Sequence, residues 1–299
     1  MIDFKKLALR DKPWVDEILL SEDSESADFN FGNMYMWVKK YPQLIARFEN
    51  RLLIRNCGEI PCYSFPVGTG ELRPAVEALR EYASDFGEKF CMLGLTDKQK
   101  AELEKEYPDC FLFRENRFFA DYIYLAEHLA AYSGKSLHGK RNHCNRFMSE
   151  HDWEFVVLTR ELIPQCMDML DDWGRDNADR LEASVEAEYD AITRGFAAYE
   201  ALKLDGGVLF ADGQLAGFSV GEMTGSRTFD VHFEKARTDS DGVYSMVCRE
   251  MTRMMLKKYP KLRYINREED MNIESMRYSK LSYKPEYLLT KYDAEWKNG

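Results

Sequence analysis

One order of predicted elements occurs twice in this chain of 299 residues, and it restricts the fold more than any single motif does. In the first half, two apolar runs on either side of Glu49-Asn50 predict a tight β-hairpin. Apolar residues then recur at helical spacing, and Thr96 with Gln99 forms a capping box that opens another helix. The predicted order is a hairpin at 44–55, a helix at 71–86, a strand at 89–93, a helix that starts after Thr96, and a strand at 118–124.

The second half repeats this order. Asp212-Gly213-Gln214 separates two apolar runs, and Asp-Gly is the strongest short signal of a hairpin. A strand, an apolar-periodic helix closed by Tyr259-Pro260, a short strand, a short helix and an extended segment follow. These elements lie at 208–221, 228–233, 243–258, 263–266, 273–280 and 283–292. Only the order of elements supports the repeat, so two related domains and a chance match both explain it.

Charge and cysteine usage exclude several classes of protein. Lys and Arg number 41 against 52 Asp and Glu, a net charge of −11, which disfavours broad attachment to DNA or to an anionic membrane. We find no apolar run of the roughly 18 to 20 residues that a membrane span needs, and the charged start lacks the apolar stretch of a signal peptide. Seven scattered cysteines without CxxC predict reduced thiols, and with five dispersed histidines they predict no metal site. We therefore expect a cytoplasmic protein without a transmembrane segment.

The segment 134–147 is unusual because it contains four Lys or Arg residues and no acid. Helical spacing places Lys140 on the same side as Cys144 and Phe147. Lys140, Arg141 and Asn142 are candidates to hold a phosphate or carboxylate, for which Lys and Arg are suited donors. A solvated basic helix that links two domains is the alternative.

The densest polar cluster follows the predicted strand at 263–266, and α/β folds usually hold ligands where a strand ends. We expect Glu268, Asn266 and His232 to transfer and orient protons. We expect Arg267, Arg277 and Lys280 to hold a carboxylate or phosphate of the acceptor. Asp270 and Tyr283 are further candidates for substrate binding. Surface salt bridges, and a hydrogen-bonded structural histidine, are the alternatives.

A third candidate site is the loop that joins the strand ending near residue 233 to the helix at 243–258. The start of a helix after a glycine exposes unpaired N–H groups and can hold a pyrophosphate. We expect the phosphate of a donor to bind at Arg237, Gly242, Val243 and Tyr244. Two aspartates occupy the loop, and the alternative is that Ser240 or Asp241 simply caps the helix.

Three motifs occur in combination: Gly134-Lys135-x-x-His138-x-Lys140-Arg141-Asn142, His232-Phe233-Glu234-Lys235-Ala236, and Ile265-Asn266-Arg267-Glu268-Glu269-Asp270. Together they resemble a bacterial family of uncharacterised proteins related to the C-terminal catalytic domain of phosphatidylglycerol lysyltransferase. The aromatic run at 29–37, which we otherwise expect to be core, also looks like this family, and the resemblance covers nearly the whole chain.

This resemblance implies a tandem GNAT fold of the α+β (mixed α/β) class, as in the Fem peptidyl transferases. The implied domains are 1–133 and 134–299, each a mixed, mostly antiparallel sheet flanked by helices. The implied chemistry is acyl or aminoacyl transfer to an amine or hydroxyl of a small molecule or lipid. In GNAT enzymes the loop before the helix at 243–258 would bind coenzyme A, but here it contains only one glycine and two aspartates. An aminoacyl-tRNA donor would explain this departure. The alternatives are a coenzyme A-dependent N-acetyltransferase and a catalytically silent ligand-binding module.

Overall fold

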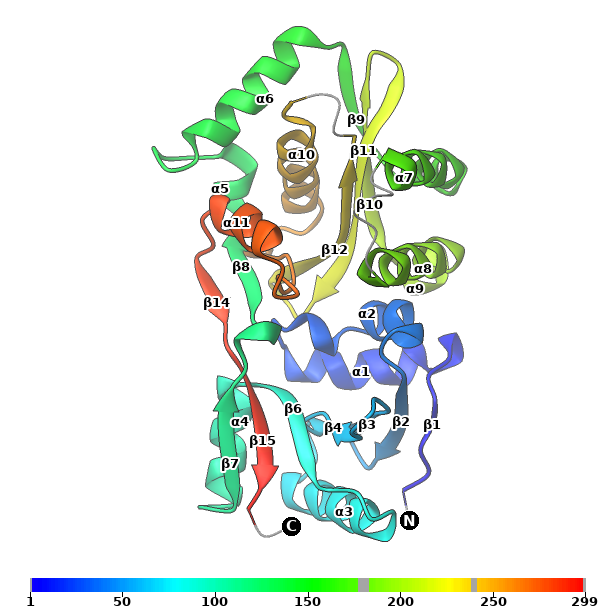
Figure 1. Cartoon of the computed structure of the whole chain (residues 1–299), viewed down its shortest axis with the longest axis vertical. Coiled ribbons are helices and arrows are strands. Elements are labelled where there is room, and N and C mark those ends of the chain that lie inside the picture. The colour runs from blue at the N-terminus through cyan, green and yellow to red at the C-terminus, as the bar shows by residue number, and fades with distance from the viewer. Residues whose placement is uncertain (1, 177–182, 238–240, 298–299) are drawn as a thin grey trace.

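The computed structural model describes residues 2–176, 183–237 and 241–297, and two mixed β-sheets lie one beyond the other along its long axis (Figure 1). The first sheet combines strands of the N-terminal half with one strand from the C-terminus. Its order is β1 (Lys5–Lys6), β2 (Gln43–Phe48), β3 (Arg51–Asn56), β4 (Cys62–Tyr63), β6 (Cys91–Thr96), β15 (Lys291–Trp296) and β7 (Phe111–Glu115), with β5 (Val67–Gly68) on β3. In the described residues its neighbouring strands are antiparallel except for β4 and β6.

The second sheet has the same plan. Its order is β9 (Trp153–Val157), β10 (Asp205–Ala211), β11 (Gln214–Thr224), β12 (Thr228–Ala236), β13 (Tyr264–Asn266), β8 (Asp121–Leu125) and β14 (Tyr287–Leu289). Here β12 and β13 are the parallel pair. Each sheet receives one strand from the other half of the chain at its next-to-last position, β15 in the first and β8 in the second. The repeat predicted from element order is therefore confirmed, whereas the boundary between 133 and 134 stays a prediction.

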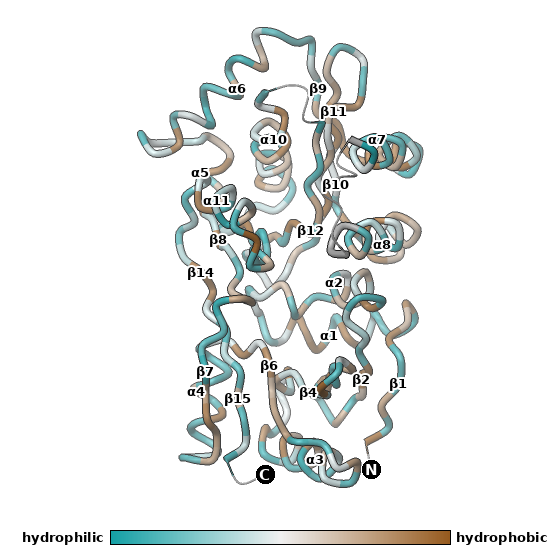
Figure 2. The backbone as a smooth tube through the Cα atoms, in the orientation of Figure 1, coloured by the Kyte–Doolittle hydropathy of each residue, from teal (hydrophilic) through white to brown (hydrophobic). Residues whose placement is uncertain are grey.

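Helices cover both faces of the second sheet. Figure 1 shows α10 (Val243–Lys258) on one side with α6 (His138–Glu150), and α7 (Ile163–Asp176) with α8 (Ala183–Ala197) on the other. Figure 2 shows that α6 is hydrophilic along most of its length. The remaining helices are α1 (Lys12–Glu22), α2 (Phe31–Met36), α3 (Leu72–Asp85), α4 (Asp97–Glu106), α5 (Ala126–Ala131), α9 (Tyr199–Leu202) and α11 (Glu274–Ser282). Among the described residues no helix is long and apolar enough to cross a membrane.

Local sequence signals account for several element boundaries. Asp212 and Gly213 both have positive φ, at 51° and 78°, as a two-residue hairpin turn requires. Thr96 caps α4 in the predicted capping box with Gln99. The predicted strand at 118–124 starts later, because the Asn116 side chain accepts a hydrogen bond from the Phe118 N–H and holds 117–119 in a 3-10 turn. Four more 3-10 turns in the described residues span Leu9–Asp11, Ala27–Phe29, Trp37–Lys39 and Arg160–Leu162.

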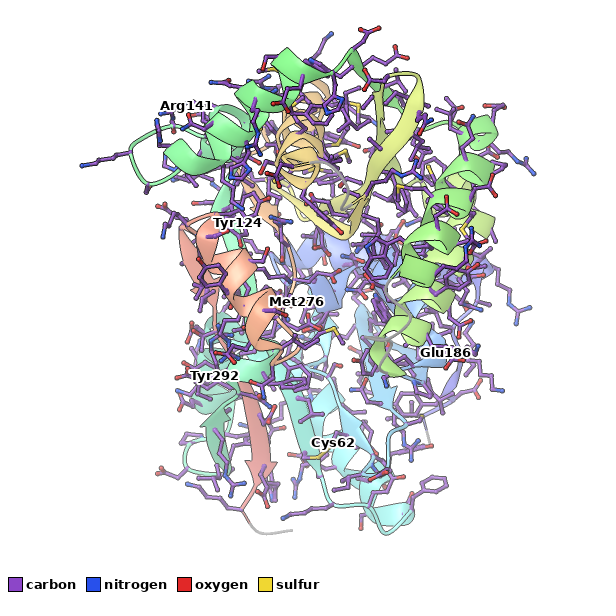
Figure 3. All side chains as sticks on the ribbon, turned by 45° about the horizontal axis from the view of Figure 1, so that its top comes forward. Cys62, Tyr124, Arg141, Glu186, Met276 and Tyr292 are labelled. Atoms are coloured by element: carbon purple, nitrogen blue, oxygen red, sulfur yellow. A yellow bond between two sulfur atoms is a disulfide. The ribbon has the colours of Figure 1, made fainter. Side chains whose placement is uncertain are left out.

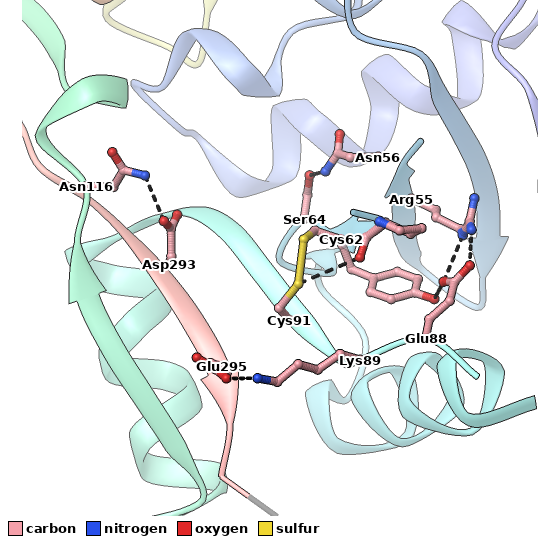
Figure 4. The surroundings of a disulfide bond; sticks show 12 residues. Arg55, Asn56, Cys62, Ser64, Glu88, Lys89, Cys91, Asn116, Asp293 and Glu295 are labelled. Atoms are coloured by element: carbon pink, nitrogen blue, oxygen red, sulfur yellow. Dashed lines mark hydrogen bonds and ion pairs between the residues drawn. A yellow bond between two sulfur atoms is a disulfide. The ribbon is translucent and has the colours of Figure 1, made fainter. Parts of the chain in front are cut away.

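Cys62 and Cys91 form a disulfide between β4 and β6, which corrects the expectation of seven reduced thiols (Figures 3 and 4). The two residues are 29 apart in the sequence, and their Cα atoms lie 5.3 Å apart. Parallel pairing of Tyr63 with Met92 brings them together, and their sequence spacing gives no sign of it. The other five cysteines are free thiols.

Candidate functional site

The candidate site lies where the parallel strands β12 and β13 diverge. Their pairing ends at Asp230 and Asn266. After Asn266 the chain turns away from the sheet, and Glu268 adopts a positive φ of 55°. Where a parallel pair diverges, side chains of both strands can line the gap between them, as in α/β ligand sites.

A β-bulge at His232 decides which side chains reach each face of the sheet here. Gly221 pairs with Val231 and Val220 pairs with Phe233, so His232 is the extra residue on β12. A bulge redirects the residues that follow it. As a result Phe233 joins the core shared with α8, although strict alternation from Val231 would turn it toward α10.

His232 is buried among three carboxylates, and we call His232, Glu222, Asp230 and Glu268 the imidazole cluster. Its Nδ1 lies 3.1 Å from Glu268 Oε1 and 3.5 Å from Asp230 Oδ2, and its Nε2 lies 3.1 Å from Glu222 Oε1. Burial opposes a charged imidazole, but attraction to Asp230, Glu222 and Glu268 outweighs it and raises the pKa of His232 well above its usual value. Of its two predicted roles, this favours orientation of Glu268 over service as a base.

The aromatic run at 29–37 supplies the wall of the imidazole cluster. Asn30 Nδ2 donates to Asp230 Oδ2 at 2.7 Å, and Asn33 Nδ2 donates to Glu268 Oε1 at 3.3 Å. A Cβ on Gly32 would lie 2.9 Å from Glu222 Cδ, so glycine allows the close approach of α2. Sequence reasoning assigned this run to the core and missed both asparagines, because the fold alone brings it near residues 222–268.

Asn266 positions the backbone of Glu268. Its Oδ1 accepts a hydrogen bond from the Glu268 N–H at 2.7 Å, and its Nδ2 donates to Asp121 Oδ2 at 3.1 Å and to the Glu25 carbonyl at 2.8 Å. The three residues expected to transfer and orient protons, His232, Asn266 and Glu268, therefore lie together. Among the described residues both hydrogen bonds of the Glu268 side chain use Oε1, and Oε2 has none.

Arg267, Glu234, Lys140 and Tyr283 form a second group, the Arg267 cluster. Arg267 Nη2 lies 2.8 Å from Glu234 Oε1, and the guanidinium lies 4.6 Å from the centre of the Tyr283 ring. Lys140 Nζ lies 3.8 Å from the centre of the same ring. Burial and the charge of Arg267 lower the pKa of Lys140. The basic segment 134–147 and the polar cluster at 264–283 thus meet at one place, as the sequence hypothesis requires.

A narrow pocket adjoins the Arg267 cluster on the α10 face of the sheet. It is lined by Phe229, Val231, Glu234, Cys248, Met251, Thr252, Met255, Ile265 and Arg267. Burial raises the pKa of Glu234, while Arg267 and Lys140 oppose the rise. Arg267 Nη1 is buried and has no hydrogen-bond partner in the described residues. Glu234 was not predicted as a site residue, although the quoted motif at 232–236 contains it.

Three residues expected to bind the acceptor instead hold the loop 267–270 in place. Asp270 is fully buried, accepts a hydrogen bond from Tyr122 Oη at 2.6 Å, and lies 2.8 Å from Arg277 Nε. Although burial opposes its charge, these hydrogen bonds hold the pKa of Asp270 well below its usual range. Lys280 Nζ donates to the carbonyls of Arg267 and Glu268 at 2.6 and 3.3 Å, and also to that of Glu269. These charged groups therefore bind partners within the protein and stabilise the loop.

Arg141 and Asn142 lie apart from both clusters. Arg141 lies on α6 at the edge of the molecule in Figure 3, and its Nη1 donates to the Tyr132 carbonyl at 2.5 Å. Asn142 is exposed, and its Nδ2 lies 3.3 Å from His138 Nδ1. Of the three candidates in segment 134–147, Lys140 alone contacts the polar cluster in the described residues.

The start of α10 is covered by α6. Gly242 is the N-cap, with a φ of 94°, and a Cβ there would lie 2.7 Å from the His143 carbonyl oxygen. Asp241 pairs with Arg146 of α6 and does not cap the helix, while residues 238–240, including Ser240, lie outside the described residues. The other residues expected there are Arg237, 3.6 Å from Asp172, and Val243 and Tyr244 in the first turn.

Glu269 makes the stability of the protein depend on pH. Burial, and then the charge of Glu268, raise the pKa of Glu269 from 4.5 to about 7, although Lys291 opposes the rise. The folded state therefore binds this proton more tightly than the unfolded state, and stability falls as pH rises from about 4.5 to about 7. We expect Glu269→Gln to remove about 1–3 kcal/mol of this fall.

Urea denaturation of the wild type and of Glu269→Gln at pH 5 and pH 8 measures this contribution. The free energy of unfolding of the variant should change less between the two pH values than that of the wild type. Glu274→Gln, an exposed substitution on α11, is the control and should behave as the wild type does. Equal pH dependence in all three proteins would contradict the assignment.

The family model for the C-terminal region of phosphatidylglycerol lysyltransferase matches residues 21–295. The chain belongs to this family. The resemblance stated from sequence motifs is therefore confirmed. A curated relative, an uncharacterised protein of Mycoplasmoides gallisepticum, is 27% identical over 178 residues, which are 58% of this chain. The matched region spans 54% of the length of that relative.

Solved structures extend the family comparison. A conserved protein of unknown function from Bacteroides thetaiotaomicron is 37% identical, with a TM-score of 0.93 over 99% of this chain and all of that one. L-PGS from Bacillus licheniformis is 15% identical, with a TM-score of 0.66 over 95% of this chain and 91% of that one.

More distant structures fix the fold class. A tandem GNAT protein from the clavulanic acid biosynthesis pathway is 12% identical and has a TM-score of 0.50 over 99% of this chain and 98% of that one. FemX is 8% identical and has a TM-score of 0.63 over the same shares. The family member described here thus has the tandem GNAT-like α+β fold that its motifs implied.

Proposed function

We propose that this protein transfers an aminoacyl group to an amine or hydroxyl acceptor at the open end of β12 and β13. The observation that carries the proposal is the position of Glu268 and Arg267. They are consecutive residues where the parallel strands diverge, and Glu268 belongs to the imidazole cluster whereas Arg267 belongs to the Arg267 cluster. Membership of the lysyltransferase family and the likeness of its fold to FemX support the same class of reaction.

In this proposal Glu268 is the general base. Oε2 takes the proton of the acceptor while the acceptor nitrogen or oxygen attacks the donor ester carbon. The carbon–oxygen bond to the donor then breaks, and the leaving oxygen takes up a proton. The imidazolium of His232 and the amide of Asn33 hold Oε1, so the carboxylate keeps one orientation during the reaction.

Lys140 and Arg267 are the proposed anchor for the phosphate of the donor. Both cations adjoin Tyr283 beside the pocket, and Arg267 has an unpartnered N–H at Nη1. Close packing of α6 on the start of α10 argues against coenzyme A, which GNAT enzymes bind at that helix terminus. Aminoacyl-tRNA is therefore the favoured donor, with a small molecule or a lipid as the acceptor.

A transfer assay tests the proposal. Labelled aminoacyl-tRNA or acetyl-coenzyme A is incubated with phosphatidylglycerol vesicles or with small amines, and label on the acceptor is measured. We expect transfer from aminoacyl-tRNA alone. Transfer from acetyl-coenzyme A alone would make the protein an acetyltransferase. Saturable binding of aminoacyl-tRNA without transfer to any acceptor would make it a silent binding module.

Lys140→Met tests the anchor within the same assay. Loss of one charge-assisted contact to a phosphate should raise KM for the donor about 5- to 30-fold with little change in kcat. Lys135→Met is the matched control, because Lys135 precedes α6, is exposed and belongs to the same basic segment. An equal rise in KM for both variants would mean that the segment attracts the donor only through its overall charge.

A further inference from the structure

Three side chains of the imidazole cluster have the spacing of metal ligands. Asp230, His232 and Glu268 each offer one ligand atom, and these atoms lie within 4.8 Å of one another. His232 Nδ1 lies 3.1 Å from Glu268 Oε1 and 3.5 Å from Asp230 Oδ2. Ligand atoms at about 2.1 Å from a tetrahedral ion lie about 3.4 Å apart, so one ion can bridge all three with small shifts.

Asp230, His232 and Glu268 have too few donors and cations around them to satisfy all of their oxygen atoms. Asp230 is fully buried, and its Oδ1 has no hydrogen-bond partner among the described residues. Three carboxylates surround one imidazole, and Lys12 Nζ lies 3.8 Å from Glu222 Oε2. Lys12 Nζ also lies 3.0 Å from Asp16 Oδ2, so the carboxylates here outnumber the cationic groups. A divalent ion in place of the imidazolium proton would offset this negative excess.

A second layer of residues orients each ligand. Glu222 Oε1 lies 3.1 Å from His232 Nε2, so this nitrogen can keep its proton on Glu222 when a metal replaces the proton on Nδ1. Asn30 donates to Asp230 and Asn33 donates to Glu268. A carboxylate or amide behind each ligand is the usual support of a metal site in proteins.

We propose that Asp230, His232 and Glu268 bind a divalent transition-metal ion of the Zn²⁺ class. One imidazole nitrogen and two carboxylates suit such an ion better than Ca²⁺ or Mg²⁺, which prefer oxygen ligands alone. The inference does not rest on the transfer reaction; a bound ion would take over from the imidazolium proton in holding Glu268 Oε1 and would leave Oε2 as it is. The sequence alone predicted no metal site, because Glu268 is 36 residues from His232 and follows a different strand.

Direct measurement of metal binding tests this site. The chain is stripped with EDTA and titrated with Zn²⁺ by calorimetry, and Co²⁺ then reports the ligand type by its absorption spectrum. We expect one strong site per chain and a Co²⁺ spectrum without a thiolate charge-transfer band. Asp230→Asn should weaken binding at least tenfold, since it removes a ligand but keeps the shape of the side chain.

A matched variant separates this site from surface histidines. His151→Gln removes a histidine whose Nδ1 lies 2.6 Å from Asp212, also a histidine–carboxylate pair, and should leave the affinity unchanged. Asn30→Ala, which loosens Asp230 without removing a ligand, should weaken binding less than Asp230→Asn. Equal affinity of Asp230→Asn and wild type at native circular dichroism, or a thiolate band with Co²⁺, would overturn the proposal. These readouts do not use transfer activity.

Discussion

Replacement of Glu268 by glutamine should lower the rate constant of aminoacyl transfer about 10²- to 10⁴-fold and leave donor affinity nearly unchanged. The amide keeps the shape of the side chain and can still accept the hydrogen bond from Asn33, but it cannot take a proton from the acceptor. The glutamate side chain is 14% exposed, so a substrate can reach it. Single-turnover transfer from a saturating donor measures the chemical step directly.

Two variants determine how this loss is explained. Glu274→Gln, at an exposed position of α11, should retain the wild-type rate constant. Asp230→Asn removes a proposed metal ligand but keeps the carboxylate of Glu268. An equal loss in Asp230→Asn and Glu268→Gln would show that the carboxylate acts through the metal site. A rate constant within threefold of wild type for Glu268→Gln would remove Glu268 from the role of base.

Elements with strong local signals were predictable from the sequence. The helix expected at 243–258 is α10 with the same bounds, since apolar periodicity and the following Tyr259-Pro260 define it locally. The hairpin at Asp212-Gly213 is also present, because its turn depends on the conformations of those two residues. The repeated element order then follows from such local signals.

Features of the site and fold that depend on contacts between residues far apart in the sequence could not be predicted. The bulge at His232 arises from the register between β11 and β12, and residue spacing does not encode it. Asn30 contacts Asp230 across 200 residues of chain, and Asn33 contacts Glu268 across 235. The exchange of β8 and β15 between the sheets likewise requires the whole fold.

Charge-based assignment was least reliable where one charge has several partners. Arg277 and Lys280 were expected to bind an acceptor, since they lie three residues apart on one helix. In the fold, Arg277 pairs with buried Asp270 and Lys280 caps the carbonyls at 267–269. A sequence shows the number of charges in a cluster, but the burial of each charge determines whether it is available to a ligand.

Replacement of Lys291 by methionine should lower the free energy of unfolding by about 3–5 kcal/mol, because it leaves the buried carboxylate of Asp121 without a counter-charge. Lys291 is 1% exposed, and its Nζ lies 2.9 Å from Asp121 Oδ1 and 2.6 Å from Asp28 Oδ2. Burial disfavours the ammonium, but Asp121 and Asp28 outweigh it and raise the pKa of Lys291. Urea denaturation near pH 7, where the ammonium is charged in both states, measures the loss.

Two comparisons show whether the loss comes from the buried pair where the sheets exchange strands. Lys291 begins β15 and Asp121 begins β8, the two exchanged strands. Lys89→Met breaks a partly exposed ion pair with Glu295, which lies on β15 as Lys291 does (Figure 4). It should lower the free energy of unfolding by no more than about 1 kcal/mol. Adding Asp121→Asn to Lys291→Met should restore part of the stability, since a neutral amide needs no counter-charge. A cost for Lys291→Met as small as that of Lys89→Met, or no recovery in the double variant, would show that the pair does not hold the two sheets together.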